Sequence, residues 1–448
     1  MASERYLLLC LLLSSLSFSF CTIPNRGIRL NLTHIDAVGD LTAWERVRRA
    51  AERTHRRLNA HLAAVTTSAA TTTLRSDGSA AATAAAARLH ASSASYLVDL
   101  AIGTPPLPLR AIFDTGSDLV WTQCDAPCRR CVRQPTPLYA PAGSATYTNV
   151  SCGAALCGAL QGSRKCSASA PQLGCAYRYS YGDGSSTAGV LATETFTLGS
   201  GAAVRGVAFG CSSDNRGGMD NSSGLVGMGR GPLSLASQLG VTRFSYCFTP
   251  FNDRKTVSPL FLGSPASLSP AAKSTPFVPS PAGLPRSSYY YLSLRGITVG
   301  DTRLPIDPAV FQLTKSGRGG IFIDSGTTFT ALEERAFAAL AREVAARVAL
   351  PVTRSKRLGL GLCFAAPKGR GPDAVDVPRL VFNFDGADME LPRGSVVVED
   401  RRAGVACLGF LKARGMTVFG CMQQQNMHVL YDLKRGVLSF EPAKCGEL

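Results

Sequence analysis

The sequence predicts a mostly β protein made of two similar β-rich lobes with a cleft between them. The chain has 448 residues, which is too long for one small core and enough for two lobes of ordinary size. Glycine (44) and proline (26) are frequent and only 17% of residues are charged, a balance typical of β-rich globular proteins. A short carboxylate turn occurs twice, as "AIFDTGSDLVW" around Asp114 and as "GGIFIDSGTTF" around Asp324.

Each carboxylate turn has a matching element further along the chain. Asp114 is followed by Gly227 in "GLVGMGR", and Asp324 is followed by Gly420 in "TVFG". Both glycines end an apolar run, so the two halves of the chain repeat a coarse pattern. Two lobes that each contribute one carboxylate are the simplest explanation, and we place them at residues 93–275 and 276–448.

The N-terminus is predicted to be a secretory signal peptide over residues 1–21. "MASERYLLLCLLLSSLSFSFC" has a short charged start and then apolar or small residues, too few to span a bilayer. The C-terminus carries no hydrophobic tail, which argues against a lipid anchor. We therefore expect a protein secreted to the extracellular space (apoplast or cell wall), with the vacuole as the alternative destination.

Residues 22–92 are predicted to be a removable prosegment. "LTAWERVRRAAERTHRRL" has a helical pattern with Trp44, Val47 and Ala51 on one face, and an Ala/Thr/Ser linker follows it. We place the mature N-terminus between residues 80 and 96. An anionic cleft would attract the basic face of this helix near neutral pH and release it on acidification, whereas the alternative is a solvated helix face. That basic face comprises Arg46, Arg48, Arg49, Arg53, Arg56 and Arg57.

The net charge of +16 allows two interpretations. A strongly basic chain can bind nucleic acid or an anionic surface. The main body, however, has no compact Lys/Arg tract with interleaved aromatic residues. We therefore predict a basic secreted protein, a monomer with no nucleic-acid partner and no membrane anchor.

The histidine inventory excludes several kinds of enzyme. Four of the five histidines lie in the predicted prosegment, which leaves only His428 in the body, within an alternating strand pattern that favours a structural role. Ser-His-Asp, Cys-His and His-based zinc sites are therefore disfavoured. The sequence "CDAPCRRC" could form a metal knuckle, but in a cysteine-rich secreted chain disulfides are the better interpretation. We expect no metal and no cofactor.

The two carboxylates remain as the chemistry-bearing groups. Two carboxylates within hydrogen-bond distance cannot both ionise cheaply, so they share one proton. One then acts as base toward a bridging water while the protonated partner hydrogen-bonds a substrate carbonyl. A single Asp-Thr-Gly or Asp-Ser-Gly is a common turn, but two copies with matched downstream glycines indicate a shared site.

The chain resembles the pepsin-like aspartic proteases. "FDTGSDLVW" and "FIDSGTT" are similar to the two active-site loops, and "YGDGSSTAG" is similar to the flap hairpin over the substrate. The downstream "SGLVGMGRGPLSLASQL" and "TVFGCMQQQNMHVLYDL" are similar to the loops beneath each aspartate. The cysteine pattern and "LNLTHID" in the prosegment narrow the resemblance to the nepenthesin-like plant branch.

The resemblance implies a role for each matching residue. Asp114 and Asp324 would be the catalytic pair, with Tyr181 as the flap tyrosine and Trp121 as its partner. Thr115 and Ser325 would tie the two loops together. The remaining implied site residues are Gly116, Ser117, Gly326 and Thr327 beside the carboxylates, Gly182 and Asp183 in the flap, and Gly227 and Gly420 under the loops.

Thirteen cysteines lie beyond the signal peptide, and the resemblance implies a pairing for twelve of them. The implied disulfides are Cys124–Cys128, Cys131–Cys211, Cys152–Cys175, Cys157–Cys166, Cys247–Cys445 and Cys363–Cys407. Cys421 is left unpaired and stands where this branch usually has asparagine, so we expect a buried inert thiol there. Loss of the amide would cost about 1–3 kcal/mol if a buried partner were left unsatisfied. Sequons at Asn31, Asn149 and Asn221 are possible glycan sites, with Asn149 and Asn221 as the candidates in the body.

The function that the resemblance implies is acidic cleavage of internal peptide bonds by an aspartic endopeptidase made as a zymogen. The prosegment would act as an intramolecular inhibitor, and proteins or peptides would be the substrates. The alternative is a catalytically inactive binding protein on the same fold, similar to plant inhibitors of xylan-degrading enzymes. Because both Asp turns and Tyr181 are intact, we favour the enzyme.

Overall fold

The computed structural model describes residues 27–37, 40–70, 96–160, 163–166, 174–217, 219, 222–253, 255–280, 288–355 and 359–448. The predicted signal peptide, the linker, the proposed mature N-terminus and the sequon at Asn221 lie outside these residues. Within them, no helix is both long and apolar enough to cross a membrane.

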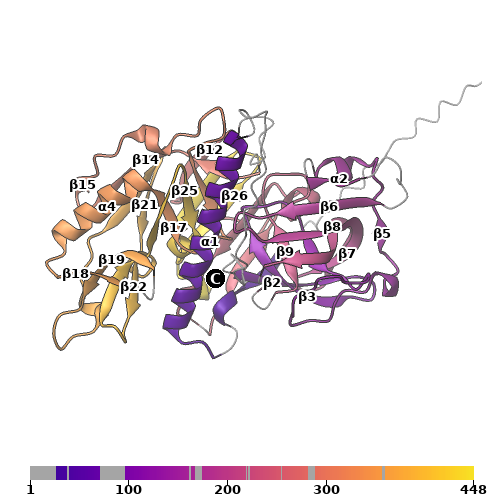
Figure 1. The fold of residues 1–448 in the computed structure, drawn as a ribbon, viewed down its shortest axis with the longest axis horizontal. Coiled ribbons are helices and arrows are strands. Elements are labelled where there is room, and N and C mark those ends of the chain that lie inside the picture. Colours follow the sequence, from indigo (N-terminus) through magenta and orange to yellow (C-terminus); the bar gives the residue numbers. More distant parts are fainter. Residues whose placement is uncertain are drawn as a thin grey trace, which may run out of the picture.

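The described chain is mostly β and forms two β-rich lobes side by side, which confirms the predicted fold class (Figure 1). The first lobe has strands β2 (Tyr96–Ile102), β3 (Leu107–Asp114), β4 (Trp121–Gln123), β5 (Thr148–Asn149), β6 (Cys175–Ser180), β7 (Ser186–Leu198), β8 (Ala202–Arg216), β9 (Gly224–Gly227), β10 (Arg243–Cys247) and β11 (Ser258–Leu262), and the short helices α2 (Ala155–Gly158) and α3 (Leu235–Gln238).

The second lobe adds two four-stranded sheets to the large sheet that the lobes share. Its elements are β12 (Lys273–Val278), β13 (Tyr290–Leu292), β14 (Leu294–Val299), β15 (Thr302–Arg303), β16 (Ile321–Asp324), β17 (Thr330–Glu333), α4 (Glu334–Arg347), β18 (Val352–Ser355), β19 (Leu360–Ala365), β20 (Leu380–Phe384), β21 (Ala387–Leu391), α5 (Arg393–Val396), β22 (Val397–Asp400), β23 (Val405–Leu408), β24 (Phe410–Ala413), β25 (Thr417–Gly420), β26 (Met427–Asp432) and β27 (Val437–Pro442).

The internal repeat corresponds to one strand pairing made twice. Strand β3 runs parallel to β9 so that Asp114 lies opposite Gly227. Strand β16 runs parallel to β25 so that Asp324 lies opposite Gly420. The two predicted Asp–Gly pairs are thus neighbours in their sheets, and each aspartate ends a buried strand.

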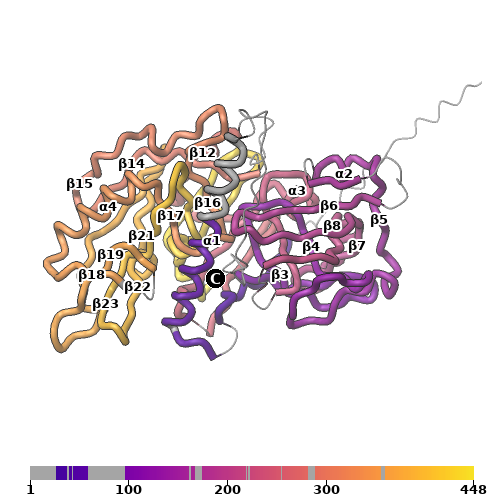
Figure 2. Tube along the Cα trace, in the orientation of Figure 1, coloured from indigo at the N-terminus to yellow at the C-terminus, as the bar shows by residue number. Residues whose placement is uncertain are grey.

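The N-terminal segment contributes a strand and a long helix. Strand β1 (Ile28–His34) lies between β2 and β11 in the large sheet, and α1 (Ala43–Ala70) runs between the lobes. Figure 2 shows the Cα trace of the first part of α1 at the junction of the lobes. The helix begins with a capping box, because Thr42 Oγ1 accepts from the Glu45 amide at 3.2 Å and the Glu45 carboxylate accepts from the Thr42 amide at 2.8 Å.

Two of the six implied disulfides are present and four are wrong. Cys247–Cys445 and Cys363–Cys407 form as expected. The implied Cys124–Cys128, Cys131–Cys211, Cys152–Cys175 and Cys157–Cys166 are replaced by Cys124–Cys211, Cys128–Cys131, Cys152–Cys166 and Cys157–Cys175.

Strand register and crowding explain these corrections. Strand β4 runs parallel to β8 and brings Cys124, just past its end, beside Cys211, with Cα atoms 5.4 Å apart. In the other cluster the sulfurs of Cys157 and Cys166 are 3.5 Å apart although they are not bonded. In this cluster the observed disulfides differ from the implied ones only in that neighbouring sulfurs exchange partners. The spacing of the cysteines in the sequence does not distinguish the two pairings.

Candidate active site

The two carboxylates are held by equivalent sets of hydrogen bonds. The Asp114 carboxylate accepts from the Gly116 amide at 3.1 Å and from the Ser117 hydroxyl. The Asp324 carboxylate accepts from the Gly326 amide at 2.8 Å and from the Thr327 hydroxyl at 2.6 Å. Both aspartates are buried. The repeated Asp-hydroxyl-Gly-hydroxyl pattern therefore builds the same local turn in each lobe.

Reciprocal hydrogen bonds join the two turns across the lobe boundary. The Ser325 amide donates to Thr115 Oγ1 at 2.9 Å, and the Thr115 amide donates to Ser325 Oγ at 3.0 Å. The Ser325 hydroxyl also donates to the carbonyl of Phe113 at 3.1 Å. All these groups are buried, so their bonds fix one turn against the other and make the bridge that the resemblance implied for Thr115 and Ser325.

Glycine is needed in both turns because each approaches the opposite carboxylate. A Cβ at Gly116 would lie 2.8 Å from Asp324 Oδ1, and a Cβ at Gly326 would lie 2.1 Å from Asp114 Oδ1. No side chain fits at such distances without displacing the carboxylates. The same two values show that the turns, 210 residues apart in the chain, place Asp114 and Asp324 in one site.

A guanidinium group of the N-terminal helix occupies this site. Nη2 of Arg57 lies 3.0 Å from Asp324 Oδ2 and 3.5 Å from Asp114 Oδ1. Burial lowers the pKa of Arg57, but the two carboxylates outweigh that effect and hold the pKa above its usual range. The arginine therefore stays charged and forms a buried ion pair with both aspartates.

Asp324 has an unusually high pKa for a carboxyl group. Burial raises it most, Arg57 lowers it and Asp114 raises it, so that the pKa of Asp324 lies at about 6. Like charge beside a buried carboxylate favours the protonated form. The pair can therefore hold a proton at mildly acidic pH.

The predicted flap residues lie on the hairpin of β6 and β7. The indole Nε1–H of Trp121 donates to the Tyr181 hydroxyl at 2.6 Å, so the expected partnership is present. The Tyr181 amide donates to the Ser185 carbonyl at 2.9 Å, which closes the turn that contains Gly182. Asp183 is buried in this turn, and one of its oxygens accepts from the Ser185 amide at 2.9 Å.

Two charged residues at the site were not identified from the sequence. Arg57 was one of six arginines on the predicted basic face, and nothing in the sequence singled it out as the contact to the dyad. Asp118 lies in the same motif as Asp114, is partly buried, and accepts from the Ser288 hydroxyl and from the Gly231 amide at 2.8 Å. Burial raises the pKa of Asp118, and the negative charge of Asp114 raises it further.

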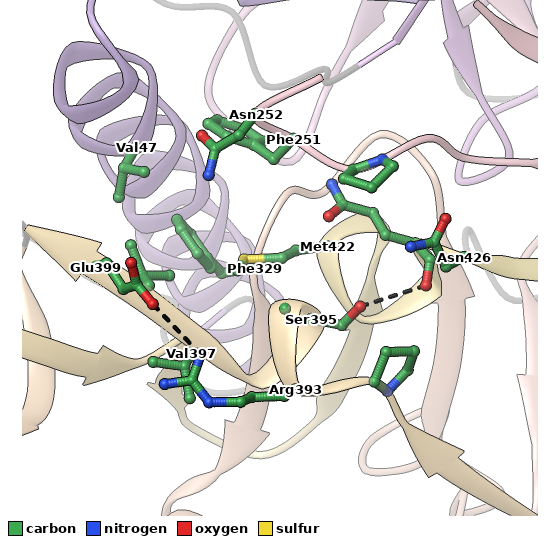
Figure 3. A pocket seen from close by; sticks show the side chains of 15 residues that line it. Val47, Phe251, Asn252, Phe329, Arg393, Ser395, Val397, Glu399, Met422 and Asn426 are labelled. Carbon is green, nitrogen blue, oxygen red and sulfur yellow. Dashed lines mark hydrogen bonds and ion pairs between the residues drawn. The ribbon is translucent and has the colours of Figure 1, made fainter. Parts of the chain in front are cut away.

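Helix α1 packs on the second lobe with its predicted apolar face. Val47 and Ala51 belong to one buried cluster with Phe329 and Met422, and Trp44 packs against it. The Phe329 amide donates to Thr54 Oγ1 at 3.2 Å. A pocket of about 210 Å³ lies beside this contact and is lined by Val47, Phe329 and Met422 among others (Figure 3).

The remaining predicted residues are His428, Cys421 and Asn149. His428 is buried in β26 with Nε2 3.0 Å from the Ser245 hydroxyl, which fits the structural role predicted for it. Cys421 is a buried thiol whose Sγ lies 3.9 Å from the Thr328 carbonyl, and its amide donates to Thr327 at 2.8 Å. Asn149 is exposed at the end of β5.

Two protein-family models match the chain, and solved structures share its fold. Residues 96–264 match the model described as xylanase inhibitor N-terminal, and residues 289–442 match the one described as xylanase inhibitor C-terminal. The crystal structure of edgp covers 79% of this chain and 92% of its own with a TM-score of 0.63 at 18% identity. Basic 7S globulin from soybean covers 79% and 95% with a TM-score of 0.61 at 19% identity. At these identities the likeness shows the fold alone.

Full-length curated relatives are more similar in sequence. The aspartic proteinase nepenthesin-1 of Nepenthes gracilis is 42% identical over 424 residues, which is 94% of this chain and 91% of the relative. Aspartyl protease 37 of Oryza sativa subsp. japonica is 36% identical over 473 residues and covers 99% of both chains. With two aspartates held in equivalent turns of a two-lobed β fold, the chain belongs to the nepenthesin-like family of plant aspartic proteases.

Proposed function

We propose that this protein is a secreted aspartic endopeptidase, synthesised as a zymogen, that hydrolyses internal peptide bonds of proteins at acidic pH. The observation that carries the proposal is the pairing of Asp114 and Asp324 in equivalent turns that bind one guanidinium nitrogen. Two carboxylates this close, one with a pKa near 6, are suited to share a proton at mildly acidic pH.

In the proposed reaction the dyad works as one acid–base unit. The ionised carboxylate takes a proton from a water molecule that attacks the scissile carbonyl, and the protonated partner donates a hydrogen bond to the carbonyl oxygen. Breakdown of the tetrahedral intermediate transfers a proton to the leaving amine. The bonds from Ser117 and Thr327 keep the carboxylates oriented throughout, which is the positioning that makes such catalysis effective.

The flap is proposed to hold the substrate over the dyad. Burial raises the pKa of Tyr181 well above its usual value, so its hydroxyl stays protonated. Since that oxygen accepts from Trp121, its own hydrogen is available for donation. The resemblance to pepsin-like aspartic proteases implies a preference for bulky apolar residues beside the scissile bond, and we expect the same preference here.

The prosegment is proposed to be an intramolecular inhibitor, acting through Arg57. Its guanidinium occupies the place where the carboxylates would hold water and the substrate carbonyl. The buried contacts of Thr54 and Ala51 hold this turn of α1 in register with the second lobe. A bound α1 thus leaves no room for a peptide at the dyad.

We further propose that the protein enters the secretory pathway, acts as a monomer outside the cell and binds neither nucleic acid nor membrane. The predicted signal peptide supports secretion. Asn149 is an exposed sequon and is therefore accessible to a glycan. The vacuole remains the alternative destination.

Hydrolysis by the purified proprotein tests the function. We expect it to cleave an unfolded protein at pH 3–5 and to be blocked by a transition-state peptide inhibitor of aspartic proteases. The measurement is the initial rate of peptide release with and without inhibitor. A folded, processed protein that cleaves nothing at any acidic pH would contradict the enzyme and favour a binding protein, the function suggested by the xylanase-inhibitor description of the matching models.

Conversion of the zymogen should be faster near pH 4 than near pH 7. Above its pKa of about 6 Asp324 is ionised and attracts Arg57, and as the pH falls through that value a proton removes the charge and weakens the ion pair. The Asp36 carboxyl behaves differently, because Arg53 outweighs the effect of burial and holds the pKa of Asp36 below its usual range. The contact at the dyad is therefore lost first.

Mass spectrometry of the chain during incubation at each pH measures this conversion. Equal rates at pH 4 and pH 7, or conversion that always requires an added protease, would contradict release triggered by pH. A dilution series separates cleavage within one molecule from cleavage of one molecule by another, because the rate constant of the first does not depend on protein concentration.

A further inference from the structure

We propose that strand β1 is a permanent strand of the large sheet, so that it stays bound after the linker is cut and the processed enzyme consists of two noncovalently associated chains. The interaction surface is the slot between β2 and β11, and its partner is residues 28–34 of the same gene product. This inference rests on the proposed zymogen function, because it assumes that processing cuts within residues 71–95.

Strand β1 is an interior strand of the sheet. Ile28 to Leu32 pair with β11, and Leu32 to His34 pair with β2. Leu32 lies opposite both Ser258 and Val98, so at that position the strand is paired on both sides. Loss of β1 would leave backbone donors and acceptors of two strands without partners, which a folded sheet does not tolerate cheaply.

The strand also packs into the main hydrophobic core, which contains residues of both lobes. Ile28, Leu30 and Leu32 are 5%, 3% and 0% exposed and belong to the main buried cluster. Their alternation with the exposed Arg29 and Asn31 places all three on the inner face. Anything that replaces β1 must supply a comparable apolar face.

The chain that remains after processing has no suitable replacement for this face. Among residues 71–95, "TTTLRSDGSAAATAAAARLHASSAS", the only aliphatic side chains larger than alanine are Leu74 and Leu89. They are fifteen positions apart, so no seven-residue strand contains both. Such a strand would bury one leucine where β1 buries an isoleucine and two leucines, and alanine has a low preference for strands. The slot therefore favours β1 over the new N-terminus.

The buried titratable groups beside β1 keep their protonation states between pH 7 and pH 4. Burial lowers the pKa of His34 to about 3, so it stays neutral, and the pKa of Asp36 is held below its usual range by Arg53. Arg29 donates to an oxygen of the C-terminal Leu448 at 2.7 Å. On β2, Tyr96 has a raised pKa, and the exposed Asp99 is paired with Arg110 on β3. Strand β11, "SPLFL", carries no titratable group.

Helix α1 is held in a different way from β1. Its ion pair with the body is that of Arg57 with the dyad, which weakens as Asp324 takes up a proton, and Val47 lines a pocket beside the helix (Figure 3). Acid therefore detaches the helix from the cleft while the strand keeps its core contacts. The tether between η1 (Ile35–Ala37) and α1 keeps the released helix near the enzyme, where it can rebind when the pH rises.

The test uses the proprotein with Asp114→Asn, which cannot process itself, and with a recognition sequence for a site-specific protease placed between residues 76 and 82. After cleavage at pH 7 the sample is divided between pH 7 and pH 4 and analysed by size-exclusion chromatography and native mass spectrometry. We expect the N-terminal fragment and the body to remain together one to one at both pH values. Elution of the body without the fragment at pH 4 would overturn the inference.

Matched variants show which part of the fragment holds it. Arg57→Ala, which loosens the helix, should leave the one-to-one complex intact at pH 4. Leu30→Ser on the buried face should speed release of the cut fragment by about tenfold or more, while Asn31→Gln on the exposed face should not. Release caused by Arg57→Ala alone would assign retention to the helix and overturn the proposal.

A second measurement stays informative if Leu30→Ser fails to fold. Hydrogen exchange on the cut protein without that substitution reports β1 directly, and we expect the amides of residues 29–33 to stay as protected as before cleavage. Rapid exchange of these amides would overturn retention. Because the cut is engineered, this test does not depend on proteolytic activity. A wild-type protein without activity would refute the proposed function but not the retention of β1. Self-processing followed by loss of β1 would support the proposed function and refute retention.

Discussion

Substitution of Asp114 by asparagine should lower the rate of peptide-bond hydrolysis at pH 3–5 by at least about 10²–10⁴-fold, the range that a positioned acid–base group contributes. The amide cannot take a proton from water, and it cannot share one with Asp324. Asparagine keeps an oxygen that can accept from the Gly116 amide, so the turn itself should survive. Initial rates on an unfolded protein substrate measure the effect, together with the thermal unfolding midpoint.

Asp125→Asn is the matched control for this experiment. It is the same chemical change at an exposed position just beyond β4, and we expect the rate to stay within about twofold of wild type because surface changes away from a site have small effects. If Asp114→Asn instead retained a rate within tenfold of wild type while folding normally, the dyad would not be the catalytic group.

Substitution of Arg57 by alanine should give a proprotein that cleaves peptides before its linker is cut. Removal of one partner from a buried ion pair costs about 3–5 kcal/mol, so docking of α1 should weaken by roughly two to four orders of magnitude. The helix then leaves the dyad more often, and substrate can enter. The measurement is hydrolysis of a short fluorogenic peptide at pH 5–6 within the first minutes, with the intact chain verified by mass spectrometry.

Arg48→Ala is the matched control, because Arg48 lies on the exposed face of the same helix and pairs with Glu52 at 2.6 Å. Such an exposed pair contributes little, so the proprotein should stay inhibited. Arg57→Lys should fall between the two, since lysine keeps the charge but lacks the planar fork. Full inhibition in Arg57→Ala would show that the guanidinium is not what blocks the site, and the apolar contacts of α1 would have to account for inhibition.

The sequence by itself determined the local parts of the active site. The Asp-hydroxyl-Gly-hydroxyl pattern predicted both turns, because their hydrogen bonds join residues two or three positions apart. The repeated downstream glycines predicted that the two halves of the chain share one coarse pattern, and the parallel pairing of β3 with β9 and of β16 with β25 is its structural counterpart. The apolar spacing of Val47 and Ala51 predicted the face on which α1 packs, since a helix has one fixed period.

Only the tertiary structure decided which distant residues meet. Six arginines on α1 were equivalent in the sequence, and the rotation of the helix against the second lobe selected Arg57 for the dyad. The register of β4 against β8 selected Cys211 for Cys124, contrary to the pairing implied by resemblance. Insertion of β1 between β2 and β11 was likewise not predictable from the alternation in "IRLNLTH". The physical reason is common to all three, because local patterns define which face of an element is apolar, while its partner depends on packing between segments far apart in the chain.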